Sequence, residues 1–241
     1  VTTTSLYGTI GGGEQNLLNN TDTSTIGGGA KNAIVNESDA STIGGGMNNL
    51  IVLNSLVSTI GGGLADTVSN TDSATIGGGA HNTILDESDA STISGGADNT
   101  ISTTALVGTI GGGWTNTINN TDSATIGGGA VNRILDESDG STIGGGADNL
   151  VTTTATVGTI GGGRMNTLNN TDSSTIGGGT NNTVLADADG STISGGVDNT
   201  IQTNSLVSTI GGGWTNTVTN TDSATIGGGS KNTVFNESDA S

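Results

Sequence analysis

Residues 75–101 read TIGGGAHNTILDESDASTISGGADNTI, and this stretch holds one complete repeat and the beginning of the next. The motif Thr-Ile-Gly-Gly-Gly first begins at Thr9 and occurs fourteen times, with Ser94 and Ser194 replacing the first glycine in two copies. Successive copies begin 16, 17 and 17 residues apart, so a unit of 50 residues lies above the single repeat. A repeat period of this length predicts a solenoid of stacked coils.

Each repeat contains two short segments that favour β-strands. One is the Thr-Ile pair itself, and the other centres on an aliphatic residue that follows a recurring Asn by two positions, such as Val68. β-Branched residues suit strands, whereas repeated glycines oppose helix. Alternation along a strand is expected to turn each Ile inward and each Thr outward. The glycine triplets permit positive φ angles at a tight corner.

We therefore predict an all-β parallel β-solenoid, a single repetitive domain over residues 1–241, with about 14 coils of 16–17 residues grouped in 50-residue super-repeats. Equivalent side chains of neighbouring coils then lie about 4.8 Å apart and form columns. One column is Ile, one is mixed aliphatic, one is Asn with Asp66 as its exception, and two are mostly Thr. The Asn residues are expected to link their amides along the axis or to occupy turns. Because the pattern is cut at both ends, we expect a fragment of a longer array.

The composition excludes several classes of protein. The chain has 45 Gly, no Pro, no Cys and a formal net charge of −18. Such a surface repels nucleic acid and anionic lipid. The lack of Cys excludes disulfides and thiolate metal sites, and no apolar run is long enough to span a bilayer. Each coil buries only two aliphatic side chains, and the free energy gained from this burial is small compared with the entropic cost of ordering the backbone. Burial against partner chains would add to it, so we expect a homo-oligomer.

The string Ser-Thr-Ile-Gly-Gly-Gly-x-x-Asn, repeated in phase along the whole chain, resembles the head repeats of trimeric autotransporter adhesins. The nearest resemblance is to YadA-like head β-roll repeats of the Gly-Gly-Gly-x-x-Asn variety. It implies a trimeric, left-handed parallel β-roll on a bacterial surface that binds host molecules, matrix molecules or other cells. The sequence departs from that pattern late in each coil, where Asn-Thr-Asp-Ser or Asp-Glu-Ser-Asp replaces the usual Gly.

Acidic residues recur three positions before Thr-Ile in two of every three copies. Stacking is expected to bring these carboxylates about one layer apart, where they repel each other unless a hard cation such as Ca²⁺ binds. The alternative is a solvated loop whose acids favour solubility and oppose lateral aggregation. The candidate metal ligands are Asp22, Asp39, Asp72, Asp89, Asp122, Asp139, Asp172, Asp189, Asp222 and Asp239.

Two sets of apolar residues also recur at fixed spacing. Leu56-Val57, Leu106-Val107 and Leu206-Val207 occupy the acid-free copies, where they either cover the gap between layers or dock another chain. Trp114 and Trp214 stand 100 residues apart, just after a glycine triplet. They are interpreted either as contact residues or as tolerated surface residues.

No arrangement of residues predicts catalysis, and we expect no enzyme. His81 is the one His in the chain, so no Ser-His-Asp set is available, and no Lys-Ser/Thr follows a glycine triplet as a phosphate loop requires. We expect a structural or adhesive rod of a cell-surface or extracellular fibre. The alternatives are a phage tail-fibre or spike shaft, and an ice-binding solenoid, whose second Thr column Arg133 would interrupt.

Overall fold

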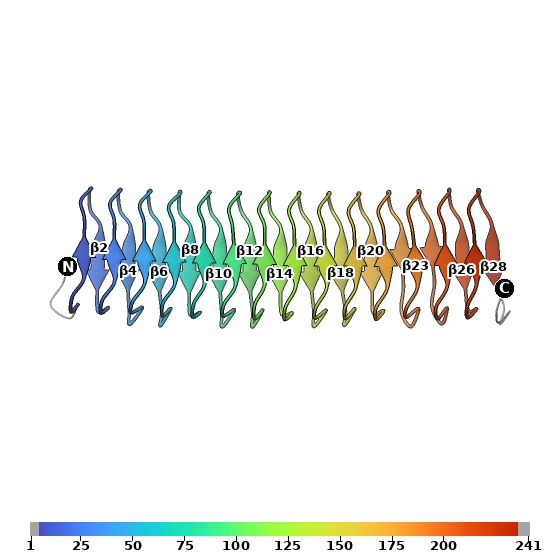
Figure 1. Cartoon of the computed structure of the whole chain (residues 1–241), viewed down its shortest axis with the longest axis horizontal. Helices are drawn as coiled ribbons and strands as arrows, with labels where there is room; N and C mark the ends of the chain where they lie inside the picture. The colour runs from blue at the N-terminus through green and yellow to red at the C-terminus, as the bar shows by residue number, and fades with distance from the viewer. Residues whose placement is uncertain (1–4, 236–241) are drawn as a thin grey trace. The chain divides into compact units, whose positions relative to one another are not determined.

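The computed structural model describes residues 5–235, which form strands and turns without any helix. Within this range no helix is therefore present that could cross a membrane. The chain divides into two compact units, Val1–Asn120 and Thr121–Ser241, and each is a stack of β-solenoid coils (Figure 1). Every coil contributes one two-residue strand and one strand of two or three residues.

In the first unit, one parallel sheet contains the Thr-Ile strands and another contains the strands that follow the Asn positions. The first sheet comprises β1 (Thr9–Ile10), β3 (Thr25–Ile26), β5 (Thr42–Ile43), β7 (Thr59–Ile60), β9 (Thr75–Ile76), β11 (Thr92–Ile93) and β13 (Thr109–Ile110). The second comprises β2 (Leu17–Asn19), β4 (Ala33–Val35), β6 (Leu50–Val52), β8 (Thr67–Ser69), β10 (Thr83–Leu85), β12 (Thr100–Ser102) and β14 (Thr117–Asn119).

The second unit repeats this arrangement. Its Thr-Ile strands are β15 (Thr125–Ile126), β17 (Thr142–Ile143), β19 (Thr159–Ile160), β21 (Thr175–Ile176), β23 (Thr192–Ile193), β25 (Thr209–Ile210) and β27 (Thr225–Ile226). The other strands are β16 (Arg133–Leu135), β18 (Leu150–Thr152), β20 (Thr167–Asn169), β22 (Thr183–Val184), β24 (Thr200–Ile201), β26 (Thr217–Thr219) and β28 (Thr233–Phe235).

The strands stack in the register that the repeat predicts. Ile76 pairs with Ile60 on one side and with Ile93 on the other, both in parallel. These isoleucines are fully buried, whereas the Thr beside each of them is half-buried and faces outward. The predicted parallel solenoid, with Ile inside and Thr outside, is therefore confirmed.

Two further buried columns were not predicted, and both consist of small residues. One contains Thr21 and its equivalents four positions before Thr-Ile, and the other contains Ser24 and its equivalents directly before Thr-Ile. Their hydroxyls donate to backbone carbonyls of the next coil or of their own coil. Ser41 Oγ, for example, donates to the Ser55 carbonyl at 2.7 Å, whereas Ser38 Oγ donates to the Val35 carbonyl at 2.9 Å. These columns let the chain turn tightly between the two sheets while most of their buried hydroxyls stay paired. Thr71 Oγ1 and Thr121 Oγ1 are buried without a partner.

Within each unit the Asn residues form a ladder on the inner side of the turns made by the glycine triplets, which we call the glycine corner. The backbone N–H of Asn49 donates to Asn32 Oδ1 at 3.0 Å, and Asn49 Nδ2 donates to the carbonyls of Gly45 and Gly63 at 2.9 and 3.1 Å. The side chain of Asn49 thus pairs with a glycine carbonyl of its own coil and with one of the next coil. The prediction of amides linked along the axis is confirmed.

Asp66 is the one member of this column that cannot repeat the pattern. It is fully buried, and its Oδ1 accepts hydrogen bonds from the backbone and side-chain N–H groups of Asn82 at 2.8 and 3.1 Å. Its Oδ2 is buried without a hydrogen-bond partner. Burial raises the pKa of this carboxyl above its ordinary value, while the hydrogen bonds from Asn82 and the charge of His81 oppose that rise.

Candidate functional site

Within residues 5–235, the predicted metal ligands lie at the corner that leads from each longer strand back to the next Thr-Ile strand. We call this the acidic corner. Stacking brings the acids of neighbouring coils together in pairs, as predicted. Their arrangement has a feature that sequence did not show. The Asp39 carboxylate accepts the backbone N–H of Asp22 at 2.7 Å, and the Asp89 carboxylate accepts that of Asp72 at the same distance.

The second unit repeats these bonds, which fixes one carboxylate oxygen of each acceptor against the preceding coil. Asp139 accepts the N–H of Asp122, and Asp189 accepts that of Asp172, both at 2.8 Å. The acid that follows an acid-free coil does the same, since Asp222 accepts the N–H of Leu206 at 3.0 Å. Each bond joins a carboxylate to the backbone of the preceding coil, so these acids have a structural role at the corner.

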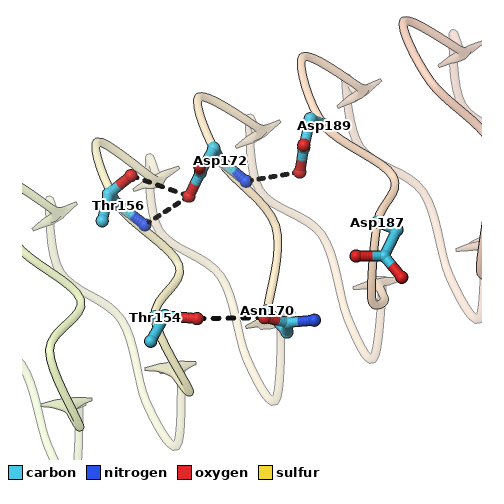
Figure 2. A pocket seen from close by; sticks show the side chains of 6 residues that line it. All are labelled: Thr154, Thr156, Asn170, Asp172, Asp187 and Asp189. Carbon is cyan, nitrogen blue, oxygen red and sulfur yellow. Dashed lines mark hydrogen bonds between the residues drawn. The ribbon is translucent and has the colours of Figure 1, made fainter.

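A shallow recess opens at the equivalent place in each unit. In the first unit it has a volume of ≈ 190 Å³ and is lined by Asn54, Asn70, Thr71, Asp72, Glu87 and Asp89. In the second unit it has a volume of ≈ 210 Å³ and is lined by Thr154, Thr156, Asn170, Asp172, Asp187 and Asp189. Figure 2 shows the chain of hydrogen bonds from Thr156 through Asp172 to Asp189, with Asp187 standing apart on its loop.

Calcium binding at the acidic corner stays a prediction. Within residues 5–235, no three acidic or His side chains come close enough together to enclose one metal ion. A bound Ca²⁺ would therefore need backbone carbonyls or water to complete its shell of six to eight oxygens. Of the ten predicted ligands, Asp239 lies outside the described residues.

Titration with Ca²⁺ is expected to release a saturable heat and to raise the melting temperature. A ligand present at a hundred times its Kd stabilises the folded state by about 2.7 kcal/mol per site. Asp89→Asn is expected to weaken the response, because it removes a charge from the recess of the first unit. Calorimetry without any saturable heat, together with an unchanged melting temperature, would eliminate the metal.

The apolar pairs occupy the acidic corner of three acid-free coils, and Thr156-Val157 takes their place in another. Leu56 is 38% exposed and Val57 is 61% exposed. The Leu56 N–H donates to Asp72 Oδ1 at 2.9 Å and the Val57 N–H donates to the Asp39 carbonyl at 2.9 Å, so acidic residues flank the pair. Val57 has a φ of 57°, a conformation that β-branched residues rarely adopt. The pairs were interpreted either as covering the gap between layers or as docking another chain, and both interpretations stay predictions.

The glycine corner carries the two tryptophans. Trp114 is 57% exposed and Trp214 is 49% exposed. Each is oriented by a hydrogen bond from its indole Nε1–H to an acid on the preceding coil, Asp98 at 3.2 Å and Asp198 at 3.3 Å. These pairs were not predicted from the sequence. Each acid stands 16 residues before its tryptophan, which is nearly one coil, and this spacing could have indicated them.

Comparison with known proteins finds no family model that matches this chain. No curated protein matches it either. The functional interpretation therefore rests on the chain's own residues and on the resemblance of its repeats.

Proposed function

We propose that this chain is a structural and adhesive segment of a cell-surface or extracellular fibre. The observation that carries the proposal is the in-register stack within each unit, which displays the same outward side chain on coil after coil. Thr59, for example, pairs with Thr75, which pairs with Thr92 of the next coil. A weak contact that recurs at fixed spacing gains strength from multivalency. The resemblance to adhesin head repeats supports the same role.

A homo-oligomer, with a trimer favoured, is part of this proposal. The exposed apolar side chains Leu56, Val57, Leu106 and Val107 recur on the first unit at intervals of 50 residues. Apolar patches spaced along a polar surface are typical of contacts between chains. Burial against partner chains would add to the narrow core of each coil.

Beads coated with the purified chain are expected to attach to cells or to extracellular-matrix proteins. The matched control removes residues 59–108, which joins Ser58 to Thr109 and keeps the repeat in phase. This shorter chain should fold and attach more weakly, because it displays fewer coils. Light scattering on the same samples is expected to give a mass above 23.3 kDa.

A folded chain that attaches to no cell or matrix surface would contradict the adhesive role. A mass equal to that of one chain would contradict the oligomer. Circular dichroism establishes in both cases that the chain is folded, so a negative result is not a failure of folding.

A further inference from the structure

The glycine corner of the second unit contains a contact between a cation and an aromatic ring. The Lys231 Nζ lies 5.1 Å from the centroid of the Trp214 ring, within the range of a cation–π interaction. Asp198 Oδ2 accepts the indole N–H of that ring. The negative carboxylate at the edge of the indole adds to the attraction of the ring face for an ammonium group. The Trp214–Asp198 pair therefore binds a cation of the same chain, the ammonium group of Lys231.

The first unit has the same pair without the lysine. Asp98 Oδ2 accepts the indole N–H of Trp114 at 3.2 Å, and the ring is more exposed than that of Trp214. The residue seventeen positions after Trp214 is Lys231, whereas the residue seventeen positions after Trp114 is Val131. In the described part of the chain, no cation lies over the Trp114 ring.

The Trp114 ring is prepared for a ligand in two respects. Its hydrogen bond to Asp98 holds the side chain in one orientation, so binding costs little additional side-chain entropy. The net charge of the chain is −18, and such a field attracts cationic partners over a distance and repels anionic ones. Neutral ligands gain nothing from this field.

We propose that Trp114 and Asp98 form a binding site for an organic cation, namely the ammonium or guanidinium group of a Lys or Arg in a basic protein segment. The site is the counterpart of the one that Lys231 fills on Trp214. The proposal gives the class of partner for the attachment role and rests on that role, although cation binding at Trp114 can be measured without it.

Tryptophan fluorescence of the full chain tests the site. Trp214→Phe leaves the emission of Trp114, and Trp114→Phe leaves that of Trp214. A Lys-rich peptide, added at constant ionic strength, is expected to change the Trp114 emission in a saturable way. An acidic peptide of the same length should have no effect. Asp98→Asn in the Trp214→Phe chain is expected to weaken binding up to about 5-fold, as for loss of one exposed opposite charge.

Trp214 provides the internal control. With Lys231 present it should respond less than Trp114, and Lys231→Val in the Trp114→Phe chain should bring its response to that of Trp114. Equal responses of the two tryptophans despite Lys231, or no effect of Asp98→Asn, would overturn the site. A change in Trp114 emission on adding neutral oligosaccharides would also overturn the site. A change seen only with phosphatidylcholine vesicles would show that the ligand is not a basic protein segment. Failed attachment with an intact Trp114 titration would remove the proposed function alone.

Discussion

Gly46→Ala is expected to disrupt the coils around it, whereas Ala at the adjacent Gly45 is expected to be nearly neutral. Gly46 has a φ of 86°, which an L side chain adopts only with strain. A Cβ at this position would overlap the carbonyl oxygen of Gly63 on the next coil and would lie 2.6 Å from Asn49 Nδ2. A Cβ at Gly45 would meet nothing within 4 Å.

The expected loss for Gly46→Ala has two parts. The left-handed conformation costs about 1–2 kcal/mol for a residue with a Cβ. Overpacking against the neighbouring coil costs about 1–3 kcal/mol more, because backbone atoms rather than a flexible side chain stand in the way. Each coil of a solenoid is stabilised mainly by its neighbours, so damage to one interface weakens the coils on both sides.

Urea unfolding followed by circular dichroism measures this difference. Gly46→Ala should unfold at a clearly lower urea concentration than the unchanged chain, and Gly45→Ala should unfold close to it. Hydrogen exchange should locate the damage in the coils that contain Gly46 and Gly63. Equal midpoints for the two variants would mean that the glycine corners do not stack as closely as the structure has them.

The period of the repeat was sufficient to predict the fold and the register. A Thr-Ile pair that returns every 16 or 17 residues has few ways to bury its Ile other than against the Ile of the next coil, as Ile60, Ile76 and Ile93 do. The inward direction of the Asn residues followed less directly, because Asn is equally common in turns. The structure places Asn49 and its equivalents in a ladder at the corner itself.

The buried Ser and Thr columns could not be predicted in the same way. Their members share a small volume rather than one chemistry, since Ser58, Ala74 and Ser91 follow one another in a single column. Ser and Thr are more often exposed than buried, so the pattern resembles that of a polar loop. The pairing of acids was predicted from coil stacking, whereas their bonds to backbone N–H groups depend on side-chain torsions that the repeat does not specify.

Asp66→Asn is expected to stabilise the chain near neutral pH, because it completes the ladder at its one interruption. Asn49 and Asn82 each donate from Nδ2 to two glycine carbonyls. By the same pattern, an Asn at position 66 would donate to the carbonyls of Gly62 and Gly79. Asp66 instead buries an oxygen without a partner there. Removing a buried unsatisfied polar group gains about 1–3 kcal/mol, and more when the group is charged.

The reverse substitution on the second unit is the matched control. Asn149 is fully buried, and its Nδ2 donates to the carbonyls of Gly145 and Gly163, both at 3.0 Å. Asn149→Asp should therefore destabilise the chain by about the amount that Asp66→Asn stabilises it. The two magnitudes are expected to differ where the neighbouring charges differ, since His81 opposes the rise of the Asp66 pKa whereas Asp148 directly precedes Asn149.

The pH dependence of unfolding tests the cause of the effect. The native pKa of Asp66 lies above its ordinary value of 3.8 because burial disfavours the charged form. Between these two values the folded chain binds more protons at this group than the unfolded chain, so its contribution to stability falls as pH rises through this window. Asp66→Asn should remove this slope, and the stability difference between the two chains should grow with pH and then level off. A difference that stays constant from acidic to neutral pH would show that Asp66 titrates normally, and that its buried oxygen is solvated in the folded chain.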